Sequence, residues 1–300
     1  MKKIKCTIGI IIMSVGLIGC RSDYHMEADN AKQEVVELGG DLDSEDQKEP
    51  DKKEVVKKEI PYTRFEDCLY TWEDNANPAL LNGYVKLSEN VESKSYNNDV
   101  GAEVLNRKTT YLEGVDASQS KINKALEEAN VRREKSLDKQ VEDVLEMTKG
   151  DVAHEYILDD SEQVIRNDER MLTIIYSLYS YTGGAHPNLY KEVVSYNPVT
   201  GEELTIASIT TNEEAFRQFV EDALHTYVTE NKCENFLFGE EAYKEALKNW
   251  DKNWWINNGY LFVGFNTYDI APYAAGPIVI PVDVTGAESY LSEYGKSLFQ

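Results

Sequence analysis

The run from Met171 to Tyr181 constrains the fold more than any other part of the chain. Its sequence, MLTIIYSLYSY, is rich in β-branched and aromatic residues and is apolar on both alternating faces, apart from one threonine and the serines. Such a run is typical of a strand that is buried on both faces. We therefore predict that Met171–Tyr181 is the most central strand of a sheet.

Three segments show the pattern of helices. From Ser118 to Met147, apolar residues recur mostly at helical spacing, and Gly150 follows as a stop, which predicts a long amphipathic helix. Thr211 and Glu214 have the spacing of a capping box at the start of a second helix. A third helix is expected from about Glu240 to Trp250.

Strand signals lie on both sides of these helices. Residues 62–112 have the pattern of short strands separated by turns. The turn 197–201 has a proline to fix φ and a glycine available for positive φ, and residues 257–259 predict a hairpin turn. The other predicted strands are Val152–Leu158, Gln163–Arg166, Leu189–Tyr196, Glu203–Ile206, Trp254–Ile256, Tyr260–Phe265 and Pro277–Val282.

This order of elements predicts an α+β fold in which helices pack on an antiparallel or mixed sheet. We expect a strand-rich N-terminal α+β subdomain over residues 61–150. A C-terminal α+β domain of sheet and helices is expected over residues 151–300.

The N-terminus carries the pattern of a targeting signal. Three lysines precede an 11-residue apolar stretch, Ile8 to Ile18, which is too short to span a bilayer as a mature helix. The stretch ends in Leu17-Ile18-Gly19-Cys20, which resembles a bacterial lipobox. Residues 1–19 are therefore expected to be a lipoprotein signal peptide and Cys20 the lipidated residue, and an ordinary secretory signal or short anchor is the alternative. Acyl chains on Cys20 would hold the protein at the extracytoplasmic face of the bacterial membrane.

Acidic residues dominate the rest of the chain. Residues 20–60 are polar, contain a single aromatic, and are expected to form a flexible acidic tether. Over residues 61–300, Asp and Glu outnumber Lys and Arg by 41 to 21, and the whole chain has a formal charge of −23. Binding to nucleic acid is therefore not expected. The charge is consistent either with solubility or with attraction of a cationic partner.

Familiar catalytic and metal motifs are missing from the sequence. It contains no Gly-x-Ser-x-Gly elbow, His-Glu-x-x-His helix, P-loop or dinucleotide fingerprint. His154 and Glu155 would point to opposite faces of a strand, so we expect neither a metal site nor a cofactor there. Cys68 and Cys233 either pair as a disulfide or remain as two thiols, and the sequence leaves both possibilities open.

Two segments are candidates for ligand binding. Tyr181-Thr182-Gly183-Gly184-Ala185-His186-Pro187 places paired glycines and an imidazole between two strands, and its alternative is a structural turn whose His186 bonds a neighbouring carbonyl. In the segment from Phe265 to Gly276, small residues around Tyr273 would leave its ring exposed in a loop. The candidate contact residues are Tyr181, Gly183, Gly184, His186, Tyr273 and Gly276.

These same segments, with Tyr196–Gly201 and Ile280–Pro281, resemble the extracytoplasmic module of RsiV-type anti-sigma factors, known as domain-of-unknown-function families 4163 and 3298. The module is similar to the non-catalytic N-terminal part of PdaC-type peptidoglycan deacetylases. The resemblance covers roughly residues 60–285 and implies an α+β fold and a role in the cell envelope, where the best understood relatives bind lysozyme.

This chain departs from those relatives in two respects. Few residues precede its apolar stretch, and no deacetylase domain is appended. We therefore expect neither transmembrane anti-sigma signalling nor deacetylase activity. The sequence predicts a membrane-anchored, non-catalytic binding module for a cell-wall-associated ligand, such as a cationic lysozyme-like protein or a peptidoglycan glycan. The alternatives are an envelope hydrolase that uses His186 and a purely structural envelope protein.

Overall fold

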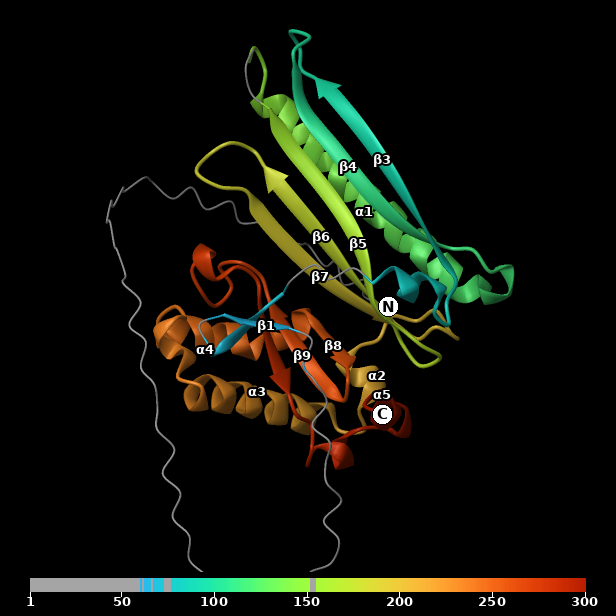
Figure 1. The fold of residues 1–300 in the computed structure, drawn as a ribbon, viewed down its shortest axis with the longest axis vertical. Coiled ribbons are helices and arrows are strands. Elements are labelled where there is room, and N and C mark those ends of the chain that lie inside the picture. The colour runs from blue at the N-terminus through green and yellow to red at the C-terminus, as the bar shows by residue number, and fades with distance from the viewer. Residues whose placement is uncertain (1–59, 61, 66, 73–76, 152–154) are drawn as a thin grey trace, which may run out of the picture. The chain divides into compact units, whose positions relative to one another are not determined.

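Two five-stranded sheets organise the computed structural model, and helices pack on both (Figure 1). The fold is α+β, as predicted. The structure describes residues 60, 62–65, 67–72, 77–151 and 155–300. The expected signal peptide, Cys20 and the tether fall on residues outside this set. Within it, no helix has both the length and the apolarity needed to cross a membrane.

Sheet B has the strand order β3-β4-β5-β6-β7 and is mixed, because β4 and β5 run parallel while the other neighbours are antiparallel. Helix α1 (Ser120–Met147) connects the two parallel strands and packs along one face of the sheet (Figure 1). Sheet B thus takes strands from both sides of residue 150. Its strands are β3 (Leu87–Asn97), β4 (Glu103–Gly114), β5 (Tyr156–Asn167), β6 (Leu172–Tyr181) and β7 (Asn188–Tyr196).

Sheet A is fully antiparallel and has the order β1-β2-β10-β9-β8. Its strands are β1 (Thr63–Phe65), β2 (Leu69–Thr71), β8 (Trp254–Asn257), β9 (Tyr260–Phe265) and β10 (Ile278–Val282). The α-helices that follow sheet B are α2 (Ile206–Ile209), α3 (Glu213–Glu230), α4 (Glu240–Lys248) and α5 (Glu293–Leu298). Single 3-10 turns are η1 (Pro78–Asn82), η2 (Ala117–Gln119), η3 (Cys233–Asn235), η4 (Trp250–Lys252), η5 (Tyr273–Ala275) and η6 (Glu288–Tyr290).

The strands of sheet A bury both faces because their side chains alternate. On one face, residues such as Ile256, Val263 and Ile280 join Phe216 and Leu224 of α3 in one apolar cluster. The other face forms a second cluster with β6 and β7, made of Trp72, Ile175, Val193, Trp255, Phe262 and Val279. Sheet A is therefore covered by helices on one side and by strands of sheet B on the other.

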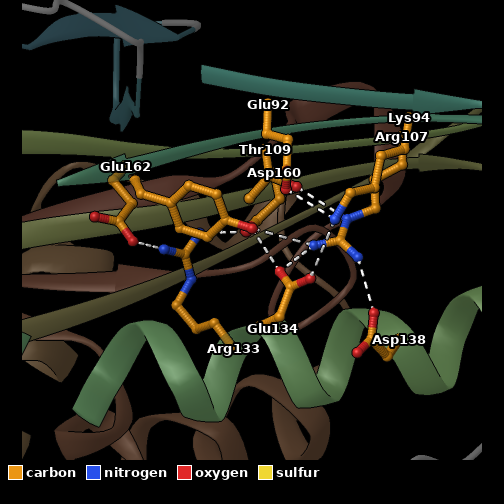
Figure 2. A network of polar contacts seen from close by, with 10 residues as sticks. Glu92, Lys94, Arg107, Thr109, Arg133, Glu134, Asp138, Asp160 and Glu162 are labelled. Carbon is orange, nitrogen blue, oxygen red and sulfur yellow. Dashed lines mark hydrogen bonds and ion pairs between the residues drawn. The ribbon is translucent and has the colours of Figure 1, made fainter. Parts of the chain in front are cut away.

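A charged network fixes α1 on sheet B (Figure 2). Arg107 of β4, whose side chain is only 1% exposed, forms ion pairs with Glu134 and with Asp138 Oδ1, the latter at 3.1 Å. Arg133 of the same helix reaches Asp160 and Glu162 of β5, and its guanidinium lies 4.4 Å from the ring centre of Tyr176. Helix and sheet are thus joined by ion pairs as well as by apolar contact, and the pairs of Arg133 with Asp160 and Glu162 are largely buried.

The same network explains one wrong prediction. The sequence suggested two strands, Val152–Leu158 and Gln163–Arg166, whereas β5 is a single strand from Tyr156 to Asn167. The polar stretch between the two predicted strands resembles a break, but Asp160 and Glu162 remain in the strand because Arg133 neutralises them.

Other local predictions need correction. Residues 87–114 form two long strands rather than several short ones, and β5, not β6, is the middle strand of sheet B. Glu203 makes only an isolated bridge with Tyr196, because α2 begins at Ile206. The cap of α3 is Asn212, whose Oδ1 accepts from Ala215 N–H at 3.2 Å, while the Thr211 hydroxyl donates to Tyr290 O.

Candidate functional site

The loop between β6 and β7 carries the first predicted segment. Gly183 and Gly184 have φ values of +84° and +104°, a region that L residues with side chains rarely adopt. The Tyr181 hydroxyl donates to Gly184 O at 3.3 Å and closes the loop on itself. The paired glycines therefore set the reversal that places His186 just before β7.

The loop between β9 and β10 carries the second predicted segment, Phe265 to Gly276. Asn266 follows β9 directly, and its side chain pairs with the backbone of Lys191 in β7: Oδ1 accepts from N–H at 2.6 Å, and Nδ2 donates to the carbonyl at 2.9 Å. These two bonds are the ones a neighbouring strand would make. One asparagine thus fixes this loop against the edge of sheet B.

The loop then turns sharply. Asp269 Oδ2 accepts from Asn266 N–H at 2.7 Å, and burial raises the pKa of the Asp269 carboxyl, although that bond and Lys252 oppose the rise. Tyr268 has a φ of +73°, which is unusual for a residue with a side chain. Strain of this kind persists only where the surroundings hold it, and it is common at binding sites.

Three rings meet where the two loops meet. The imidazole of His186 stacks on the ring of Tyr273 with 3.7 Å between centroids and 21° between planes. Tyr268 completes the group, with its ring centre 6.2 Å from that of His186 and 5.9 Å from that of Tyr273. Tyr268 is 50% exposed, and His186 and Tyr273 are half-buried. We refer to His186, Tyr268 and Tyr273 as the ring cluster.

The hydrogen bonds of His186 define its tautomer. Nδ1 lies 3.0 Å from Pro187 O, a carbonyl that can only accept, so Nδ1 carries a proton. In the neutral ring Nε2 must then accept, and the Tyr268 hydroxyl, 3.1 Å away, donates to it. The phenol oxygen of Tyr268 keeps its lone pairs for a ligand, while both imidazole nitrogens are engaged by groups that are not carboxylates.

The predicted site residues fall into three groups. His186 and Tyr273 come into direct contact through their stacked rings. Tyr181, Gly183 and Gly184 shape the loop of His186 rather than adding to the ring cluster, and Gly276, with φ +65°, donates its N–H to Tyr273 O at 2.9 Å and closes η5. Cys20 lies outside the described residues, as does His154. Tyr268 was not among the candidates, because its role depends on a backbone angle that no sequence pattern marks.

The ring cluster lies in an uncharged part of an acidic chain. No Asp, Glu, Lys or Arg occurs in residues 171–190, 253–268 or 270–282. The segments that build the cluster thus present aromatic rings, a phenol oxygen and backbone groups, with the exposed Asp269 as the one charged residue between them. Such a surface can stack on a ring or an apolar side chain and can exchange hydrogen bonds with neutral groups.

Known protein families match two parts of the chain. Residues 101–189 match the family model described as deacetylase PdaC, and residues 207–284 match the model of a protein of unknown function, DUF3298. His186 lies in the first matched region, and Tyr268 and Tyr273 lie in the second. The ring cluster therefore joins the two regions.

Solved structures show the same fold. A DUF3298 family member from Bacteroides fragilis NCTC 9343 has a TM-score of 0.51 and 16% identity, over 72% of this chain and 98% of that one. A DUF3298 family protein from Pseudomonas aeruginosa PAO1 has a TM-score of 0.50 and 16% identity, over 69% of this chain and 95% of that one. No curated protein gives a significant match in sequence.

Proposed function

From the premise that the chain carries a PdaC/DUF3298 module of the cell-envelope type, we propose that it is a non-catalytic receptor for a cationic, cell-wall-associated protein of the lysozyme kind. Its place would be the extracytoplasmic face of the membrane, held there by lipid on Cys20. One observation carries the proposal: a partly exposed cluster of uncharged rings lies within a strongly acidic chain.

That arrangement suits a protein partner. Hot spots of protein interfaces are enriched in aromatic residues near the centre of the contact, and charges at the rim steer the partner toward it. The ring cluster supplies the first feature. Residues 61–300 contain 41 acidic and 21 basic residues, and this excess of acid supplies the steering charges. The same negative charge disfavours anionic wall polymers as ligands.

His186 has features of a binding residue rather than a catalytic one. Its Nδ1 bonds a backbone carbonyl and its Nε2 bonds a phenol, so no carboxylate orients the ring for general-base work. The stack on Tyr273 restricts the ring further. The resemblance to lysozyme-binding modules supports the same kind of partner.

Calorimetry tests the proposal. Residues 56–300, which form one compact unit, would be titrated with lysozyme and separately with purified muropeptides. We expect saturable binding of lysozyme, and a loss of about 30-fold in affinity for Tyr273→Ala, the loss typical of a hot-spot residue. Tyr84→Ala removes a tyrosine that is 44% exposed and lies before β3, and it should leave the affinity unchanged.

Each other outcome has a defined meaning. Binding of muropeptides but not of lysozyme would show that the ligand is a glycan rather than a protein. Equal losses of affinity for Tyr273→Ala and Tyr84→Ala would show that the ring cluster is not part of the interface. No heat with either ligand would overturn the receptor proposal, and turnover of muropeptides would favour the hydrolase alternative.

A further inference from the structure

Two buried thiols lie together where the first hairpin of sheet A meets the end of α3. Cys68, in the turn between β1 and β2, is 3% exposed, and Cys233, in η3, is fully buried. Cys233 Sγ lies 3.3 Å from Cys68 O. Both are free thiols in this structure.

The surroundings hold the hairpin at this position. The Tyr227 hydroxyl of α3 donates to Cys68 O at 2.9 Å, and Arg64 Nη2 donates to Asn231 Oδ1 at 3.1 Å. The rings of Phe65 and Phe236 meet edge to face with 6.2 Å between centroids. Contacts from both sides of the cysteines therefore fix the two backbones against each other. The side chains of Cys68 and Cys233 also share a hydrogen bond, so the two sulfurs are already neighbours.

We infer that Cys68 and Cys233 form a disulfide that locks the β1–β2 hairpin to the α3–η3 turn in an oxidising compartment. Oxidising compartments lie outside the cytoplasm, and disulfides persist in them. The proposed location supplies only the oxidant, and the pairing itself depends on the geometry of the two cysteines.

The reaction is thiol–disulfide exchange with a protein disulfide as oxidant. The thiolate of one cysteine attacks a sulfur of the oxidant, and a mixed disulfide forms while one oxidant thiolate leaves. The second cysteine attacks the bonded sulfur of the first, which closes the Cys68–Cys233 bond and releases the second oxidant thiolate. The two cysteines lose two protons and two electrons; the oxidant gains the two electrons, and its two released thiolates take up the two protons.

Burial controls when this exchange can happen. Burial, together with a hydrogen bond to the Cys68 side chain, raises the pKa of the Cys233 thiol, so the folded reduced form holds little of the attacking thiolate. The β1–β2 hairpin lies at the edge of sheet A, with three residues in each strand, and its opening would expose both sulfurs. We expect oxidation to be fastest during folding and reduction of the finished protein to be slow.

Redox titration of the full chain tests the pairing. The folded chain and the same chain in urea would be equilibrated with mixtures of reduced and oxidised glutathione, quenched with acid, and digested for mass spectrometry. We expect the linked Cys68–Cys233 peptide to be at least 10-fold more abundant, relative to the free peptides, in the folded chain than in urea. The chain used is the unprocessed one, without signal cleavage or lipidation, so Cys6 and Cys20 provide reference thiols in the same sample.

Failure of this expectation overturns the inference. It is wrong if folding leaves the abundance of the linked peptide unchanged or lowers it, or if Cys68 and Cys233 are recovered mainly with glutathione, Cys6 or Cys20. Thermal unfolding gives an independent check, since reductant should lower the melting temperature of the oxidised chain and leave those of Cys68→Ala and Cys233→Ala unchanged. Neither measurement involves a ligand, so the result is separate from that of the receptor proposal.

Discussion

The imidazole of His186 lies nearly parallel to the ring of Tyr273, at 3.7 Å between centroids. His186 lies in the region that matches PdaC, and Tyr273 lies in the region that matches DUF3298. This contact is therefore both part of the candidate site and a connection between the two matched parts of the chain.

A double-mutant cycle measures that connection. We expect His186→Ala and Tyr273→Ala to show a coupling of about 0.5 to 1.5 kcal/mol in the free energy of unfolding, because each variant removes the same stack. Urea unfolding of the four proteins gives the value. The pair His186→Ala and Tyr84→Ala is the control and should be additive, and additivity of His186→Ala with Tyr273→Ala would contradict the stacking contact.

Salt should slow association with a cationic partner. Exposed charges are screened over about 10 Å at 0.1 M ionic strength, so steering by the acidic surface weakens as salt rises. We expect the association rate constant for lysozyme to fall at least about 10-fold between low and high salt, while the dissociation rate constant changes little. Stopped-flow or surface-binding kinetics give both constants. An association rate constant that does not change with salt would indicate that the acidic residues serve solubility alone.

Loss of Arg133 should destabilise the fold in a pH-dependent way. Arg133→Met leaves Asp160 and Glu162 buried without their cation, and breaking a buried pair of this kind costs about 3 to 5 kcal/mol. Burial already raises the pKa of Asp160, and Arg133 opposes that rise. Without Arg133 the folded state favours the protonated acid more strongly, so stability is lost as pH rises through the folded-state pKa.

The loss in free energy of unfolding that Arg133→Met causes, relative to the native chain, should therefore be larger at pH 7 than near pH 5. Urea unfolding at the two pH values measures it. Arg132→Met, which removes the exposed neighbour on the same helix, should change stability by less than about 0.5 kcal/mol. Equal deficits for the two variants, or a deficit that does not depend on pH, would contradict the network in Figure 2.

Two glycines with positive φ should respond differently to alanine. Gly184, at φ +104°, has open space where a Cβ would lie, so Gly184→Ala meets only backbone strain of about 1 to 2 kcal/mol. Gly201, at φ +72°, would place its Cβ 2.5 Å from Lys121 O, and the turn would have to move away from α1. We expect a clearly larger fall in melting temperature for Gly201→Ala, and the reverse order would contradict this packing.

Local patterns predicted most elements of the fold. The helix expected from Ser118 to Met147 is confirmed as α1, and the turns at Gly201 and Gly259 have the positive φ values that their sequences suggested. The expected strands between Trp254 and Val282 are present with nearly the predicted bounds. These features depend on residues that are close in sequence, where spacing and turn chemistry are informative.

Features that depend on distant partners were missed. In the sequence, Asp160 and Glu162 resemble loop residues, because their ion pairs with the distant Arg133 are not visible there. Thr211 resembles a helix cap, but its hydroxyl donates to the carbonyl of Tyr290 instead. In the site, the sequence suggested that His186 and Tyr273 are functional, but their contact depends on Asn266 pairing with β7. Tyr268 lies within the segment from Phe265 to Gly276 that the sequence singled out, but it was not among the candidate residues, because only the folded loop gives it a positive φ.

The pairing of β2 with β10 has a consequence for how the chain is made. Thr71 lies opposite Ile278, so sheet A needs residues from both ends of the described chain, whereas sheet B needs nothing beyond Tyr196. A chain that leaves a ribosome or a secretion channel amino end first can assemble sheet B while sheet A still lacks its central strand. A product truncated before residue 278 would expose the apolar surface of β6 and β7 to proteases. Sheet A is therefore completed only after β10 has been made.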